Sequence, residues 1–182
     1  MKLLILGAGG QGHVVKESAE AANIYEKISF LDDDEAKKDI TIGKLNDCVK
    51  LAREYQCAFA AFGDRELRVR WLAKLAELGF AIPAVIHPAA YVSPSAVIGS
   101  GTFVGAKCVV NTRSSIGRGC ILSVGSIVDS DSTIGDACHL DCCAIVKANS
   151  IVASNTWIDS SKVFELDRIK SFSANYSFED GM

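Results

Sequence analysis

Residues 116–140 read IGRGCILSVGSIVDSDSTIGDACHL, and an aliphatic residue returns at every sixth position of this stretch. The same phase extends in both directions, from Ile86 to Phe164, and all fourteen of its positions are apolar. Four residues after each of these positions, from Ala90 to Thr156, a second track carries only small residues. Because about half of the residues in an average protein are apolar, fourteen in one phase would arise by chance on the order of once in 10,000. The two tracks therefore describe a repeated unit of six residues.

A period of six fits neither the turn of an α-helix nor the alternation of a single strand. It is typical of a solenoid in which each hexapeptide forms one side of a triangular coil, with the aliphatic residue inside and the small residue where the chain bends. We therefore predict a left-handed parallel β-helix over residues 86–163. Glycines that directly follow the aliphatic residue are expected to adopt positive φ at a turn; they are Gly99, Gly105, Gly117 and Gly135.

The segment before the β-helix alternates short apolar runs with amphipathic runs, which predicts strands and helices in turn. Strands connected through helices imply a parallel sheet with helices on both faces. Residues 1–85 are thus expected to form an α/β, Rossmann-like domain, and residues 164–182 a C-terminal tail. The expected strands cover residues 2–6, 28–31 and 57–62, and the expected helices run to about Ala22, over 44–55 and over 64–78.

A GxGxxG motif joins the first strand to the first helix, at Gly7, Gly9 and Gly12. Its backbone N–H groups and the helix N-terminus suit a phosphate, and Asp32, at the end of the second strand, can bind a ribose. Taken alone, the motif indicates an NAD(P)-binding oxidoreductase, an alternative that stays open, as does a glycine turn without a ligand. However, the domain is about half the size of a dinucleotide-binding fold and no dehydrogenase catalytic domain follows. A nucleotide-linked sugar therefore fits better.

Charge and composition narrow the possible partners. The net charge is −3 and no Lys/Arg cluster occurs, which argues against nucleic-acid binding. The apolar start at residues 3–6 is too short for a signal peptide or a membrane span, so we expect a soluble, cytoplasmic protein that does not bind membranes. The seven cysteines include no CxxC pair, so we expect no metal and interpret the thiols as reduced packing residues.

Four features together resemble the NeuD-type sugar O/N-acyltransferase family, over residues 1 to about 160. They are the opening GAGGQG-HVV, the FLDDD after the second strand, the FGDRELR segment and the hexapeptide solenoid. The resemblance implies a homotrimer with acetyl-CoA as the donor, a nucleotide-linked sugar as the acceptor and active sites at subunit boundaries. The residues that it assigns to the sugar nucleotide are Gly9, Gly10, Gln11, Asp32, Asp33, Gly63 and Arg68.

The resemblance also assigns catalytic positions, and there the chain departs from the family. Ser130 stands where the family has its general-base histidine, followed by the supporting acid, Asp131, and by a second histidine, His139. The family's glycines that face acetyl-CoA read Cys143 and Ala148, so acetyl-CoA would contact His139, Cys143 and Ala148. A serine hydroxyl cannot take a proton near pH 7 as imidazole does. Either His139 or Asp131 is the base, or the chain is an impaired relative that only binds a sugar nucleotide or a partner.

Overall fold

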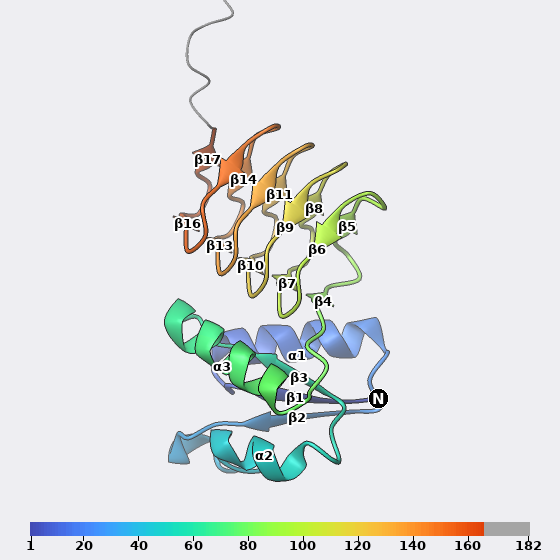
Figure 1. Cartoon of the computed structure of the whole chain (residues 1–182), viewed down its shortest axis with the longest axis vertical. Helices are drawn as coiled ribbons and strands as arrows, with labels where there is room; N and C mark the ends of the chain where they lie inside the picture. Colours follow the sequence, from blue (N-terminus) through green and yellow to red (C-terminus); the bar gives the residue numbers. More distant parts are fainter. Residues whose placement is uncertain (166–182) are drawn as a thin grey trace, which may run out of the picture.

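The computed structural model describes residues 1–165 and contains two domains stacked along the long axis of the molecule (Figure 1). The first domain is a three-stranded parallel sheet with strand order β2-β1-β3. Its elements are β1 (Lys2–Leu6), α1 (Gly10–Ala22), β2 (Lys27–Leu31), the 3₁₀ turns η1 (Glu35–Lys37) and η2 (Leu45–Asp47), α2 (Cys48–Leu51), β3 (Cys57–Ala60) and α3 (Arg65–Glu77).

The central strand β1 is apolar on both faces because helices cover both. Leu3 and Ile5 belong to the cluster that contains the α1 residue Val15, whereas Leu4 and Leu6 belong to the cluster formed with α2 and α3. A strand buried on both faces reads as a continuous apolar run, as residues 3–6 do. The prediction of a parallel sheet with helices on both faces is confirmed.

The helix predicted over residues 44–55 is present only as η2 and the short α2. Two carboxylates account for the tight turn at its start. Asp47 accepts a hydrogen bond from the backbone N–H of Lys44, and Asp33 accepts one from that of Leu45. Side chains that satisfy backbone donors in this way favour turns over continuous helix.

The second domain is a left-handed parallel β-helix of two-residue strands, arranged as three sheets. We call them the first sheet (β4, β7, β10, β13, β16), the second sheet (β5, β8, β11, β14, β17) and the third sheet (β6, β9, β12, β15). The strands are β4 Val85–Ile86, β5 Tyr91–Val92, β6 Val97–Ile98, β7 Phe103–Val104, β8 Val109–Val110, β9 Ser115–Ile116, β10 Ile121–Leu122, β11 Ile127–Val128, β12 Thr133–Ile134, β13 His139–Leu140, β14 Ile145–Val146, β15 Ile151–Val152, β16 Trp157–Ile158 and β17 Val163–Phe164.

Both predicted tracks line the interior of this β-helix. The second residue of every strand points inward, and the small track packs beside it, including the buried thiols of Cys108, Cys120 and Cys138. Residues eighteen apart occupy equivalent places in successive coils, as the pairing of Ile121 with His139 shows. The hexapeptide repeat thus predicts this domain, strand by strand.

The prediction for the corner glycines is wrong, although glycine is needed there. Positive φ falls two residues later in each repeat, with values from +55° to +71° at every sixth residue from Gly101 to Ser161. Gly117 and Gly135 are instead pressed against the next coil. A Cβ on Gly117 would lie 2.6 Å from the backbone nitrogen of Asp136, and one on Gly135 would lie 2.4 Å from that of Ser154.

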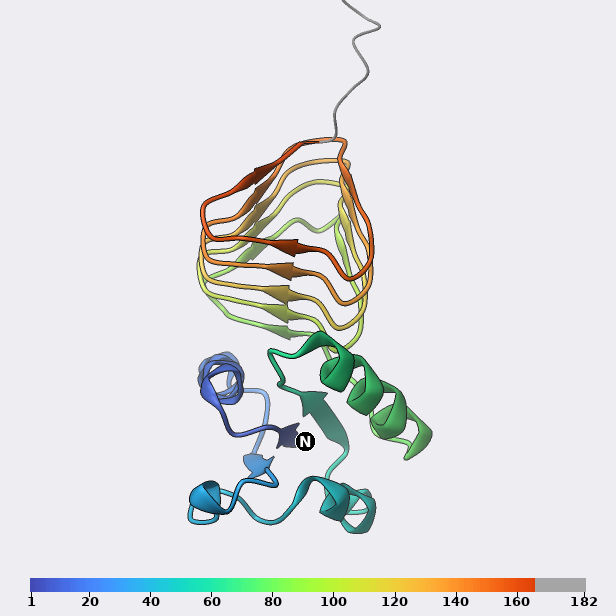
Figure 2. The same cartoon turned by 90° about the vertical axis from the view of Figure 1, so that its left-hand side faces the viewer.

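The first sheet joins the β-helix to the N-terminal domain. Its outward residues Phe103 and Ile121 are buried in the same cluster as Leu3, Ile5 and Phe59 of the N-terminal sheet. Figure 2 shows this sheet lying over α1, α3 and the N-terminal strands. No helix within residues 1–165 is long and apolar enough to cross a membrane. The predicted tail beyond residue 165 lies outside the described residues.

Candidate active site

The glycine loop leaves an open surface at the carboxyl end of β1. Gly12 must be glycine, because a Cβ there would lie 2.0 Å from the carbonyl oxygen of Gly7. Gly9 and Gly10 have no atom within 4 Å of the place where a Cβ would stand. No side chain caps the N-terminus of α1, so its first N–H groups are available to an anionic ligand.

Asp32 fixes this loop. Its carboxylate accepts hydrogen bonds from the N–H groups of Ala8 (2.7 Å) and Asp34 (3.0 Å) and pairs with Lys37 Nζ at 3.0 Å. Partial burial raises the pKa of Asp32, but these donors outweigh burial and hold the pKa below its ordinary value of 3.8. The predicted ligand residue therefore already has several partners within the chain.

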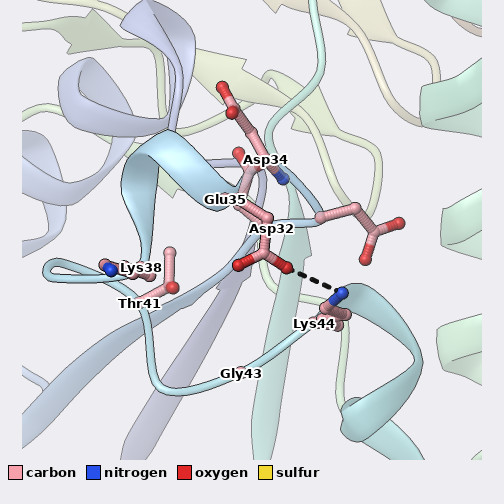
Figure 3. A pocket seen from close by; sticks show the side chains of 8 residues that line it. Asp32, Asp34, Glu35, Lys38, Thr41, Gly43 and Lys44 are labelled. Carbon is pink, nitrogen blue, oxygen red and sulfur yellow. Dashed lines mark hydrogen bonds and ion pairs between the residues drawn. The ribbon is translucent and has the colours of Figure 1, made fainter.

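Next to Asp32 lies an acidic pocket of about 150 Å³. Asp33 and Glu35 contribute carboxylates, and the Glu35 carboxylate pairs with Lys44 Nζ at 2.8 Å (Figure 3). Carboxylate acceptors and lysine donors together suit a flat ligand with both donors and acceptors on its edge, such as a nucleobase. The pocket is lined by Asp32, Asp33, Asp34, Glu35, Lys38, Thr41, Gly43 and Lys44.

Gly63 and Arg68 follow β3, on the other side of β1. Gly63 is open like Gly9 and Gly10, and places a third exposed glycine at the carboxyl edge of the sheet. Arg68, in contrast, is 1% exposed, and its guanidinium donates to the carbonyl oxygens of Phe62, Gly63 and Gly119. The structure thus gives Arg68 a role in fastening the β3–α3 loop to the β-helix.

A larger pocket of about 400 Å³, the junction pocket, lies where α1 faces the corner between the first and second sheets. Gln11 comes from the first turn of α1, and its Nε2 is buried without a hydrogen-bond partner within residues 1–165. The pocket thus adjoins the glycine loop. Its lining residues are Gln11, Val14, Glu17, Ser18, His87, Phe103, Gly105, Ala106, Ser123, Val124 and Cys142.

His139 reaches the junction pocket through Ser123. Its Nε2 lies 3.2 Å from Ser123 Oγ, and its ring packs against Trp157 at a tilt of 43°, with 3.9 Å between centroids. His139 is 8% exposed, and its Nδ1 has no partner among the described residues. Burial, followed by the charge of Arg68, lowers the pKa of His139 to about 4. The imidazole is therefore neutral at physiological pH.

Most of the remaining predicted site residues lie apart from His139 within one chain. Ser130 and Asp131 are at the corner between the second and third sheets, where Arg113 binds the Asp131 carboxylate through two contacts of 2.7 Å. Cys143 is at the corner between the first and second sheets, and Ala148 is near Ser130, one coil further along. Cys143 thus shares the corner that lines the junction pocket, next to the lining residue Cys142, whereas one subunit alone does not bring Ser130, Asp131 and Ala148 together with His139.

Sequence reasoning missed Ser123 and His87 as pocket residues. The length of one coil could have grouped them. Residues 87, 105 and 123 are eighteen apart, so they stack in one column beside the first sheet. The eighteen-residue spacing predicts this column, but it does not predict which helix faces the column. The position of α1 depends on how the two domains dock, which no local pattern encodes.

Comparison with known proteins adds further information. The family model of the PglD N-terminal domain matches residues 2–75. The acetyltransferase domain of PglB from Neisseria gonorrhoeae, in complex with acetyl coenzyme A, is 31% identical, with a TM-score of 0.73 and 88% of each chain covered. A variant of perosamine N-acetyltransferase from Caulobacter crescentus, in complex with CoA and GDP-perosamine, is 27% identical, with a TM-score of 0.79 and coverage of 91% of this chain and 89% of the other.

Proposed function

The chain belongs to the NeuD/PglD-type sugar acetyltransferases, and from this premise we propose that it transfers an acetyl group from acetyl-CoA to an amino group of a nucleotide-linked sugar. The observation that carries the proposal is the continuity of the open glycine loop with the junction pocket. The loop offers backbone donors to a diphosphate, and the pocket opens directly beside Gln11.

The two pockets suggest how the acceptor lies. The nucleobase enters the acidic pocket, the diphosphate contacts Gly9 and Gly10, and the sugar reaches the junction pocket. Asp32 supports this arrangement because it holds the glycine loop and lines the acidic pocket. The donor thioester would then meet the sugar beside Ser123 and His139.

The chemistry requires removal of a proton from the attacking nitrogen. Asp131 is a poor candidate, because the Arg113 guanidinium lowers its pKa and occupies both carboxylate oxygens. His139, acting through Ser123, is the better one: its neutral imidazole can take a proton at any pH above about 4. Its weak basicity makes that transfer uphill, so we expect slow turnover that increases with pH as the sugar ammonium loses its own proton.

A homotrimer would complete the site. The second sheet presents an outward column of apolar side chains, of which Tyr91 and Val163 are more than half exposed. Such a face calls for a partner, and three copies of a triangular coil can cover it by closing a ring. The contact would bring Ser130, Asp131 and Ala148 of one copy toward the neighbouring copy. The outward column is Tyr91, Val109, Ile127, Ile145 and Val163.

A direct test measures thiol release from acetyl-CoA with UDP- and GDP-linked amino sugars, together with the product mass. Gly10→Val provides the matched variant, because a Cβ there meets nothing within 4 Å and the fold should survive. We expect the variant to keep its melting temperature but to lose binding of the nucleotide sugar. Unchanged binding would show that the loop holds no ligand.

One rival function has an observation in its favour. The replacement of the family's histidine by Ser130, with an imidazole of low pKa left at His139, suits a relative that binds a sugar nucleotide without acetylating it. Calorimetry separates the two functions: the rival predicts binding of the nucleotide sugar but not of acetyl-CoA.

The seven free thiols favour a reducing compartment, which we propose to be the cytoplasm.

A further inference from the structure

One column of residues forms the wall of the junction pocket that faces α1. His87, Gly105 and Ser123 occupy equivalent places in three successive coils, and backbone hydrogen bonds join each coil to the next. Coils lie about 4.8 Å apart, so the backbones at His87 and Ser123 are separated by about 9.6 Å. Gly105 adds no side chain to the wall between them, and a Cβ there would lie 3.0 Å from the carbonyl oxygen of Leu122. The gap between the two polar side chains is therefore the space of the junction pocket in front of this wall, which at about 400 Å³ has room for a group as small as an acetyl.

The orientation and tautomer of His87 follow from its own turn. His87 Nδ1 accepts a hydrogen bond from the backbone N–H of Ala89 at 2.9 Å. An accepting Nδ1 carries no proton, so the proton of the neutral ring is on Nε2. The half-buried ring lines the pocket, and Nε2 has no hydrogen-bond partner within residues 1–165. His87 therefore offers a fixed, uncharged hydrogen-bond donor.

We propose that His87 is a catalytic residue whose Nε2–H binds the carbonyl oxygen of the acetyl thioester during transfer. This assignment rests on the proposed function. As the sugar nitrogen bonds to the carbonyl carbon, negative charge develops on that oxygen; it returns to form the carbonyl when the C–S bond breaks and CoA leaves as its thiolate. A neutral, positioned donor stabilises this charge without a proton transfer of its own.

Ser123 cannot fill this role as well, because its hydroxyl is shared with His139 Nε2. The column thus places an oxygen-binding donor at one end of the gap and a proton acceptor at the other. The amine would approach from the Ser123 side and the carbonyl oxygen would lie toward His87. His87 and Ser123 therefore have different roles, although both line the junction pocket.

Two substitutions test the roles of Nδ1 and Nε2 of His87 separately. His87→Asn keeps an acceptor for the N–H of Ala89 but removes the distal donor, whereas His87→Gln places an amide donor near the position of Nε2. Removing one such donor typically costs about 100- to 1,000-fold in kcat. We expect a loss of that size in His87→Asn with the KM for the nucleotide sugar unchanged, and recovery to within about tenfold of wild type in His87→Gln. A kcat in His87→Asn within threefold of wild type would overturn the assignment.

A second measurement on the unmodified protein avoids any folding defect in a variant. The chain has only three histidines, so ¹⁵N NMR can resolve His87. We expect a protonated Nε2 whose resonance moves when acetyl-CoA is added; a proton on Nδ1, or no change at saturation, contradicts the proposal. Wild-type protein that binds no acetyl-CoA overturns the proposed function and this assignment together. Wild-type transfer with an unaffected His87→Asn overturns the assignment alone.

Discussion

At the residue scale, the burial of His139 makes the stability of the fold depend on pH. Its pKa falls from an ordinary 6.5 to about 4 in the folded chain. Between these values the unfolded chain binds more protons than the folded chain, so the free energy of unfolding decreases as pH falls from 6.5 to 4. Asp32 and Asp131 contribute to this dependence only below about pH 5, because their pKa values are lowered from 3.8 in the folded protein and the unfolded chain takes up protons at these carboxylates first.

We expect His139→Gln to flatten this dependence. Glutamine does not titrate, and its amide can still bond to Ser123 Oγ. The measurement is the urea midpoint at pH 7 and at pH 5, where wild type should lose stability and the variant should lose markedly less. Parallel losses in both proteins would show that another group titrates.

Ser130 poses a second question at this scale. Introducing an imidazole by Ser130→His should raise acetyl transfer if this position is that of the family's base, because a positioned base contributes about 100- to 10,000-fold. The structure limits the gain, since Arg113 holds the Asp131 carboxylate that would orient the new ring. We therefore expect a modest gain from Ser130→His and a larger one when Arg113→Gln is added.

The control for this experiment is Arg113→Gln alone, which should leave the thiol-release rate near that of wild type. If Ser130→His lowers a measurable wild-type rate, the site works around a different base. His139→Ala should then abolish transfer.

At the scale of the element, neighbouring positions of one corner should respond in opposite directions. Gly117→Ala would force a Cβ to 2.6 Å from the next coil, so we expect a loss of about 1–3 kcal/mol. Ala137 sits at a left-handed φ of +58°, which costs an L-residue roughly 1–2 kcal/mol, so Ala137→Gly should be neutral or stabilising. Denaturant melts of both variants check the pair; stabilisation by Gly117→Ala would refute the packing explanation.

Element by element, the sequence predicts what local spacing determines. The β-helix was predictable because every strand repeats the same two contacts, inward at the aliphatic residue and inward again at the small one. The close packing of Gly117 against the next coil was not predictable, because a single repeat does not reveal how closely the next coil approaches. The shortness of α2 was not predicted for a similar reason, since Asp33 reaches Leu45 from another loop.

At the scale of the whole molecule, the candidate site depends on how the N-terminal domain packs against the β-helix. The resemblance assigns Gly9, Gly10 and Gln11 to the sugar nucleotide, and these residues lie beside an open surface. Arg68 was expected to bind the sugar nucleotide, yet its guanidinium donates to carbonyl oxygens of both domains. Only the packed arrangement shows that its donors are already used. The separation of Ser130 from His139 likewise appears only once the corners are known.

The outward column of the second sheet gives a prediction at this scale. Ile127→Glu would bury a carboxylate in the proposed contact, so the trimer should dissociate to chains of 19.4 kDa. Thr133→Glu is the matched control, because it introduces the same charge on the third sheet, where Thr133 is exposed. Light scattering at micromolar concentration measures both; a wild-type mass of one chain would refute the trimer.

The eighteen-residue coil also restricts how this protein can change its length in evolution. An insertion of six residues between Ser123 and His139 would keep the interior pattern but move the imidazole from the first sheet to the second, away from Ser123. Any other number below eighteen would displace it as well or break the aliphatic phase. Only the gain or loss of whole coils keeps the imidazole on the first sheet, and even that moves it about 4.8 Å along the β-helix. Point substitutions are therefore the more accessible route by which relatives of this chain acquire or lose activity.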